Sequence, residues 1–249
     1  MLDGPRRCVS VCLVLALLSA AACQRGLGKQ YEYEEQLYLD LDGSATVVLN
    51  ASIPALVALR GLKLDTSPDA RIDRNDVRQQ FAAPHVRVTG VSRPWRRNGR
   101  RFVQVRFAAD SVKDLTELAP PGWSTYGYVS DGQQVSYSQK VGPAVNTPPP
   151  GVNWDGTEIV GFRLHMPSRI GYHNAPTREV ERGNILTWEQ TLADRLQGAP
   201  VDIQVTMDAH SIFARTMTLF VVAVGAALLL LVAAVWWIRK KGQAAHRTA

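Results

Sequence analysis

Residues Thr218 to Ile238 read TLFVVAVGAALLLLVAAVWWI, an unbroken apolar run without a charged side chain. A helix rises about 1.5 Å per residue, so this stretch reaches about 30 Å, the thickness of a bilayer's hydrocarbon core. Trp236 and Trp237 lie at its end, and such amphipathic rings favour the headgroup layer. The run predicts a transmembrane helix over residues 216–238. The residues before it should therefore form the part of a membrane protein that lies on one side of the bilayer.

Three basic residues, Arg239, Lys240 and Lys241, follow the apolar run directly. Positive charges next to a span stay on the cytoplasmic side. We therefore expect a single-pass protein of the cell membrane, with residues 239–249 as a cytoplasmic tail and an exported domain over residues 23–212.

The N-terminus independently predicts export. Residues 1–22 have the order of a signal peptide: two arginines, an apolar segment over residues 9–18, and small residues before a cleavage point. Cys23 comes next, and the pattern Leu18-Ser19-Ala20-Ala21-Ala22-Cys23 resembles a bacterial lipobox, with alanine where leucine is usual three residues before the cysteine. We expect Cys23 to be lipidated; ordinary cleavage after Ala22 is the alternative.

Composition narrows the function classes. The net charge of +6 suggests nucleic acid as a partner, but residues 24–215 hold 22 Lys and Arg against 21 Asp and Glu. The basicity therefore belongs to the membrane-targeting ends, and we expect no nucleic-acid partner. All three cysteines lie in the first 23 residues, so the domain has neither a disulfide nor a thiolate metal site.

The domain sequence alternates hairpin and helix signals. Asp42-Gly43, Asn98-Gly99 and Asp131-Gly132 each separate two alternating segments, which is the signature of a tight β-hairpin turn. Helices are expected over residues 72–83 and from Ser111, and a Pro-rich loop over residues 142–156 precedes three further strands. This order predicts an α+β fold, an antiparallel sheet with about two helices on one face.

Late in the domain the sequence carries Phe162-x-Leu164-x-Met166-Pro167, then Asn174, then Asn184-Ile185-Leu186-Thr187-Trp188. With the lipobox-like signal, the β-rich domain and the C-terminal span, this layout resembles the LppM-type lipoprotein family of bacteria. Ala175 stands where that family usually has glycine. The resemblance implies an envelope protein that binds lipid or glycolipid, and it implies no catalytic residues.

Candidate catalytic and metal-binding residues are sparse. The exported histidines show no tight ligand spacing, and Ser168 near His173 lacks the Gly-x-Ser-x-Gly elbow of a hydrolase. Glu32, Glu34 and Asp40 share one face of the first strand, which fits a Ca²⁺ site, acid–base chemistry, or an acidic edge strand that resists aggregation. We expect no enzyme, no metal site and no cofactor.

The sharpest local feature is residues 93–101, RPWRRNGRR, which we call the arginine hairpin. The non-functional interpretation is a solvated basic turn. The functional interpretation is contact with an anionic lipid surface or a glycolipid, because each basic residue near such a surface contributes about 1 kcal/mol and tryptophan favours the interface. The residues predicted to make this contact are Arg93, Trp95, Arg96, Arg97, Arg100 and Arg101.

The sequence therefore predicts a membrane-anchored, non-enzymatic envelope protein whose exported domain binds lipid, glycolipid or an envelope partner beside the membrane. A different class remains open, an assembly subunit that docks another membrane protein. A hydrolase is the third interpretation, and it would need a pocket with a cluster of perturbed ionisable groups.

Overall fold

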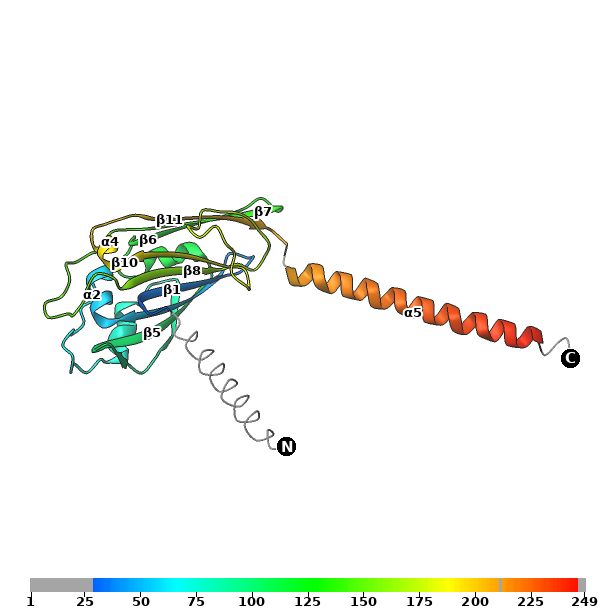
Figure 1. Ribbon diagram of the computed structural model, residues 1–249, viewed down its shortest axis with the longest axis horizontal. Coiled ribbons are helices and arrows are strands. Elements are labelled where there is room, and N and C mark those ends of the chain that lie inside the picture. Colours follow the sequence, from blue (N-terminus) through cyan, green and yellow to red (C-terminus); the bar gives the residue numbers. More distant parts are fainter. Residues whose placement is uncertain (1–28, 211, 246–249) are drawn as a thin grey trace, which may run out of the picture.

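A computed structural model describes residues 29–210 and 212–245, and it contains a two-sheet α+β domain followed by one long helix (Figure 1). The α+β fold class is confirmed.

Within the described residues, sheet A has the order β10-β8-β1-β2-β5-β3, with β4 paired to β5, and sheet B has the order β6-β7-β11-β9. The strands of sheet A are β1 (Tyr31–Leu39), β2 (Ala45–Ser52), β3 (Val86–Val91), β4 (Trp95–Arg97), β5 (Arg100–Ala109), β8 (Ile159–His165) and β10 (Ile185–Thr191). Those of sheet B are β6 (Ser124–Ser130), β7 (Gln134–Val141), β9 (Ile170–His173) and β11 (Val201–Asp208).

The three predicted hairpin turns are all present. Gly43, Gly99 and Gly132 have φ values of 86°, 73° and 87°. Asn98 also adopts a left-handed φ of 48°, which gives the β4–β5 connection the two positive φ angles of a type I′ turn. These dipeptides are therefore the reason that β1–β2, β4–β5 and β6–β7 are adjacent antiparallel pairs.

Sheet A is mixed rather than antiparallel throughout, because β1 pairs with β2 on one side and in parallel with β8 on the other. The first strand is thus central, and the interpretation of its acidic face as edge protection is wrong. Glu32 and Glu34 are buried in the sheet, whereas Asp40 lies beyond the end of β1 and contacts Ser44 in the turn.

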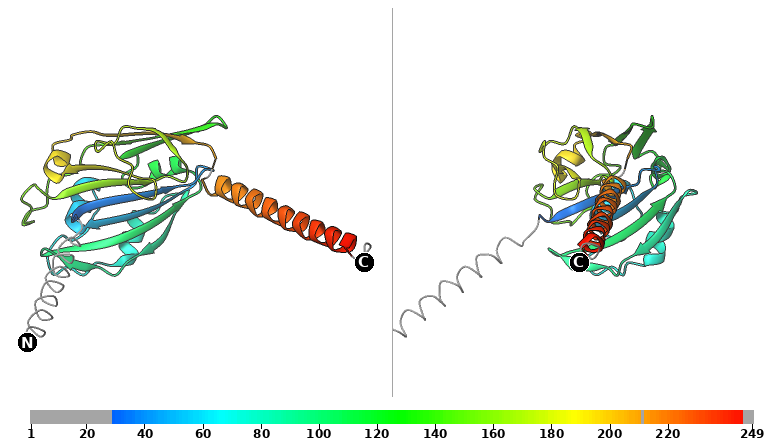
Figure 2. Two further views of the ribbon diagram at one scale, coloured as in Figure 1. Left: turned by 45° about the vertical axis from the view of Figure 1, so that its right-hand side comes forward. Right: turned by 90° about the vertical axis from the view of Figure 1, so that its right-hand side faces the viewer.

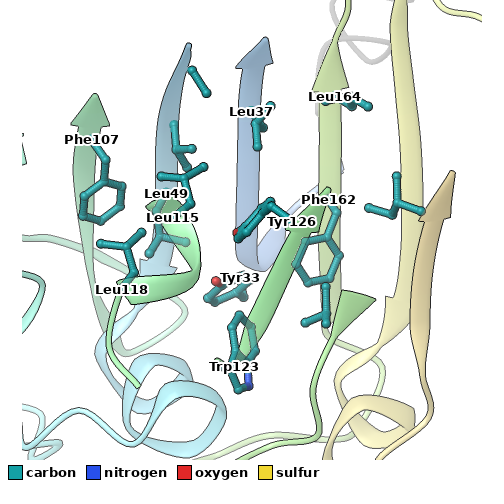
Figure 3. Close-up of a cluster of buried hydrophobic side chains, with 14 of the residues drawn as sticks. Tyr33, Leu37, Leu49, Phe107, Leu115, Leu118, Trp123, Tyr126, Phe162 and Leu164 are labelled. Atoms are coloured by element: carbon teal, nitrogen blue, oxygen red, sulfur yellow. The ribbon is translucent and has the colours of Figure 1, made fainter. Parts of the chain in front are cut away.

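The core lies between the two sheets. Figure 3 shows Tyr33, Leu37 and Phe162 of sheet A on the same side as Tyr126 and Trp123. The Tyr33 ring lies 5.9 Å from that of Trp123 and 6.0 Å from that of Phe162, in edge and tilted geometries that favour aromatic pairs. This packing leaves the opposite face of sheet A, its outer face, free to form a surface.

Short helices connect several of the strands. The predicted helix after Ile72 is α3 (Arg74–Gln80), capped by Asp73, and the predicted helix after Ser111 is the 3₁₀ helix η2 (Val112–Glu117). Two helices were not predicted, α2 (Ile53–Arg60) and α4 (Leu192–Leu196). Ser52 caps α2 and a proline occupies its first turn, so the residue that ends β2 also starts a helix.

The last element is α5 (Ile212–Ala245), which leaves the domain where β11 ends (Figures 1 and 2). In the part of the chain that the structure describes, one helix is long and apolar enough to cross a membrane, over the 22 residues Thr216–Trp237. None of this span is buried against the domain. The predicted signal peptide and Cys23 lie outside the described residues.

Candidate functional site

A row of polar side chains crosses the outer face of sheet A. The strand register aligns Glu34 of β1 with Asn50 of β2, and Asn50 with Gln104 of β5. Gln104 donates from Nε2 to Asn50 Oδ1 at 2.9 Å, and Asn50 donates from Nδ2 to Glu34 Oε2 at 3.1 Å. The two amides therefore fix the orientation of a carboxylate in the middle of the sheet.

Tyr31 joins this face because β1 is irregular at its start. The register with β8 shifts between Tyr31 and Tyr33, so Glu32 is an extra residue and Tyr31 turns away from the core face. Its ring lies over Gly161, where a Cβ would stand 2.6 Å from the ring. Its hydroxyl donates to Glu189 of β10, which also accepts a bond from Lys29 Nζ at 2.5 Å.

An arginine connects the row to the loop before β10. Arg163 of β8 donates to Glu181 at 2.9 Å, and its other terminal nitrogen lies 3.6 Å from Glu34 Oε1. Thr187 also donates to Glu181, at 2.7 Å. Charge-assisted bonds of this kind are short and directional, so they hold the side chains in fixed positions.

Aromatic side chains flank the polar row. Trp95 of β4 stacks on Phe102 of β5 with ring centroids 5.8 Å apart and planes at 23°, and 38% of Trp95 remains exposed. The Arg97 guanidinium lies 4.2 Å from the centre of the Phe102 ring and donates to the backbone carbonyl of Tyr31. These contacts hold an exposed indole beside Glu34 and Asn50.

Together these side chains line an open cleft of about 510 Å³, which we call the outer cleft. Its lining residues are Lys29, Tyr31, Glu34, Asn50, Trp95, Arg97, Phe102, Arg163, Glu181 and Glu189. Three carboxylates balance three cations, and the walls are partly aromatic. Such a site offers both donors and acceptors beside apolar ring faces, which suits a neutral group with many hydroxyls.

The pKa values of two residues of the cleft, Tyr31 and Glu189, are shifted. Burial raises the pKa of Tyr31, and its bond to Glu189 raises it further, so the hydroxyl stays protonated and donates. Burial works against ionisation of Glu189, but hydrogen bonds from Lys29 and Tyr31 outweigh it and lower the pKa of Glu189. Glu189 is therefore a fixed anion at neutral pH.

The structure divides the arginine hairpin between different roles. Arg97 and Trp95 line the outer cleft. Arg100 is paired inside the domain, 3.0 Å from Glu32 and 3.7 Å from Glu158, with only 10% of its side chain exposed. Its charge stabilises the start of the sheet and is screened from any outside surface.

The other three predicted contact residues lie on the surface. Arg96 pairs with Asp69 at 2.8 Å, and Arg101 donates to the carbonyl of Pro68 at 2.9 Å. Arg93 is exposed. A pair between exposed side chains is worth at most about 1 kcal/mol, so Arg96 can exchange Asp69 for another anion.

The hairpin tip lies at the end of sheet A opposite to α5. Arg97 contacts the first residue of β1, whereas the turn after β1 lies beside β6, where Tyr128 donates to the carbonyl of Leu41. The neighbouring β6–β7 turn bonds to Ala209, next to the start of α5. The predicted surface-contact residues and the apolar helix α5 are thus separated by the length of the sheet.

The other sequence candidates do not assemble into a site. The hydroxyl of Ser168 donates to the carbonyl of His210, while His173 Nδ1 accepts from the backbone of Ala175. Ser168 and His173 therefore make no nucleophile–base pair. The described residues contain no group of three or more His, Cys, Asp or Glu side chains able to hold a metal ion.

Sequence reasoning missed most of the outer cleft. Asn50, Arg163 and Glu189 come from three strands far apart in the chain, and only the register aligns them. Simple alternation from Tyr33 would place Tyr31 on the core face, because the irregularity at Glu32 has no local signature. The available signal was the run of acidic residues in β1, which is unusual for a central strand.

Comparisons with known proteins give a weak structural likeness. No family model and no curated protein matches the chain. Among solved structures, the chain is similar to the folded domain of the LppM protein of Mycobacterium tuberculosis, determined by NMR. The TM-score is 0.38 and the identity 10%, over 72% of this chain and 91% of that one. A likeness at this level assigns no family or ligand to this chain.

Proposed function

We propose that this chain is a membrane-anchored bacterial envelope protein, without enzymatic activity, whose exported domain binds the hydroxyl-rich headgroup of a lipid or glycolipid. The observation that carries the proposal is the outer cleft, with Trp95 on one side and the bonded row of Glu34 and Asn50 below it. α5 and a lipid on Cys23 would hold the domain at the membrane.

The chemistry of the cleft selects this ligand class. A sugar or polyol ring presents C–H groups that pack on an aromatic face, and hydroxyls that bond to carboxylates, amides and guanidinium groups. Three carboxylates offset the three cations, so the cleft has no net charge to attract a purely anionic headgroup. A non-enzymatic role fits Glu34 and Glu189, since each is already held by fixed donors.

The test uses the full-length protein in phosphatidylcholine nanodiscs, titrated with digalactosylglycerol, the deacylated headgroup of a neutral glycolipid. We expect binding, and a loss of about tenfold on Trp95→Ala, which corresponds to about 1.4 kcal/mol for one aromatic wall. Asn50→Ala should also weaken binding, because it releases Glu34.

The matched control is Tyr38→Ala. Tyr38 belongs to the same strand as Glu34 and is 39% exposed, yet it stacks on His165 outside the cleft. Its replacement should leave binding unchanged. Equal binding of glycerophosphoglycerol, an anionic headgroup, or unchanged affinity in both cleft variants, would contradict the proposal.

A second candidate function is docking of another envelope protein. Val129 and Tyr172 are 66% and 54% exposed, and both lie in one row across the outer face of sheet B, through Ser136 and Thr206. This row is near the end of the domain that leads into α5. A partner that co-purifies in fixed ratio, and is lost on Tyr172→Ser, together with an absence of headgroup binding, would favour this candidate.

A further inference from the structure

The two ends of the domain are far apart. β1 begins beside the arginine hairpin, since Arg97 bonds to the carbonyl of Tyr31 and Asn98 lies 3.3 Å from Gln30. β11 ends beside the β6–β7 turn, since Ala209 donates to the carbonyl of Gln133 at 2.9 Å. The nine residues of β1 separate these ends by about 30 Å, at about 3.3 Å per residue.

This separation decides what the arginine hairpin can reach. If the domain stood on α5 with its strands upright, the hairpin would be about 30 Å above the bilayer, the length of β1. Charge is screened over about 8 Å at physiological ionic strength, so the arginines would not sense the lipid surface. The outer cleft, which shares Trp95 and Arg97 with the hairpin, would be distant from headgroups as well.

A lipid on Cys23 would change this geometry. Seven residues, 24–30, lie between Cys23 and Tyr31, and a fully extended chain covers at most about 29 Å over these eight residue-to-residue steps. An upright domain would need this segment to run straight down the whole sheet, with a large loss of chain entropy. A domain that lies along the membrane needs no such extension. The apolar span of α5 is not packed against the domain, so no contact between them opposes this orientation.

We propose that the Cys23 lipid and α5 anchor the domain at both ends, so that it lies along the bilayer and its Tyr31 end becomes a second membrane-contact surface. This inference rests on the lipidation included in the proposed function. The partner is the headgroup layer of the membrane that holds the protein, and the contacting side chains are Lys29, Arg93, Trp95 and Arg96.

The exposed chemistry of this end fits a headgroup layer. Lys29 and Arg96 side chains are 62% and 53% exposed, Arg93 is exposed, and Trp95 presents more than a third of its surface. Cationic side chains with apolar stems and amphipathic rings are the groups that settle at this depth. The orientation also brings the mouth of the outer cleft to the lipids whose headgroups it is proposed to bind.

The absence of cysteine from residues 24–249 makes the orientation measurable. Once Cys23 is acylated, a single introduced cysteine is the only free thiol of the mature protein. Asp69→Cys places a fluorophore next to the hairpin, where Asp69 is 96% exposed. Ser130→Cys places one at the exposed end of β6, beside the β6–β7 turn and near α5, as the matched control.

The experiment compares two acylated proteins in nanodiscs that contain headgroup-quencher lipids. One has the native linker, and the other has about twenty Gly and Ser residues inserted after Gln24, which add a flexible reach of about 25 Å. We expect strong quenching at position 69 with the native linker and loss of most of that quenching with the long linker. Quenching at position 130 should be the same in both.

Each other outcome overturns the inference. An unquenched label at position 69 in the native, acylated protein means that the domain stands upright, while headgroup binding by the cleft would survive as a separate result. Equal quenching at position 69 with both linkers means that the hairpin binds lipid without the tether. An intact mass without the acyl group removes the second anchor, and with it the lipoprotein part of the proposed function.

Discussion

Glu35 lies 3.7 Å from the Arg60 guanidinium between the two sheets, and each side chain is 3% exposed. The carboxylate also accepts bonds from Tyr33, Tyr126 and Gln139 at 3.1, 3.1 and 2.9 Å. A buried charge needs this many partners, because its desolvation would otherwise exceed the attraction of the pair. The network therefore fixes how sheet B sits on sheet A, and with it the shape of the outer face.

Breaking this pair from one side should be costly. Arg60→Met leaves Glu35 buried as an uncompensated charge, so we expect a loss of about 3–5 kcal/mol in the free energy of unfolding. The double replacement Arg60→Met with Glu35→Leu should recover part of that loss. Urea unfolding followed by circular dichroism of the reconstituted protein measures both, and a double variant less stable than Arg60→Met would refute the reasoning.

Replacement of Gly161, which lies beneath the Tyr31 ring, should affect the outer cleft specifically. Gly161→Ala places a Cβ 2.6 Å from the Tyr31 ring, so the ring must move and its bond to Glu189 is lost. We expect about 1–3 kcal/mol of overpacking cost and weaker headgroup binding. Gly171→Ala is the control, because its Cβ would meet Thr206 at an ordinary 3.6 Å. Equal effects of the two replacements would show that Tyr31 is not held as described.

The position of Tyr31 and the Glu35–Arg60 pair show the limit of what the sequence predicts. Turns were predicted because Asn-Gly and Asp-Gly carry their conformational preference locally, and the apolar run of α5 needs no tertiary information. Alternation alone misplaces Tyr31, because a one-residue bulge inverts the face of every residue before it. Glu35 stood on the apolar face between Tyr33 and Leu37, a visible anomaly, but its partner Arg60 comes from an unpredicted helix.

Stability should depend on His165 in mildly acidic solution. Burial, then the nearby Arg163 charge, lowers the pKa of His165 below its usual 6.5, and its Nε2 has no hydrogen-bond partner among the described residues. The unfolded chain therefore binds the proton first, so stability is complete above about pH 6.5 and falls as the pH decreases toward the folded-state pKa.

His165→Phe tests this directly, since a phenylalanine ring keeps the stacking on Tyr38, whose centroid lies 3.9 Å away. We expect the urea midpoint of the native protein to fall between about pH 7 and about pH 5 by more than that of the variant. Identical pH profiles for the two proteins would mean that the folded and unfolded states bind the proton equally well at this position.

The arginines of the hairpin should separate into structural and surface groups. Arg100→Gln leaves Glu32, which is 2% exposed, without its cation, although Trp154 still donates to it at 2.9 Å. We expect a loss of about 3–5 kcal/mol in the free energy of unfolding, because a buried carboxylate has lost its charge partner. Arg93→Gln removes an exposed charge and should stay within about 0.5 kcal/mol of the native protein. Urea unfolding distinguishes the two, and a stable Arg100→Gln variant would return Arg100 to the residues available for lipid contact.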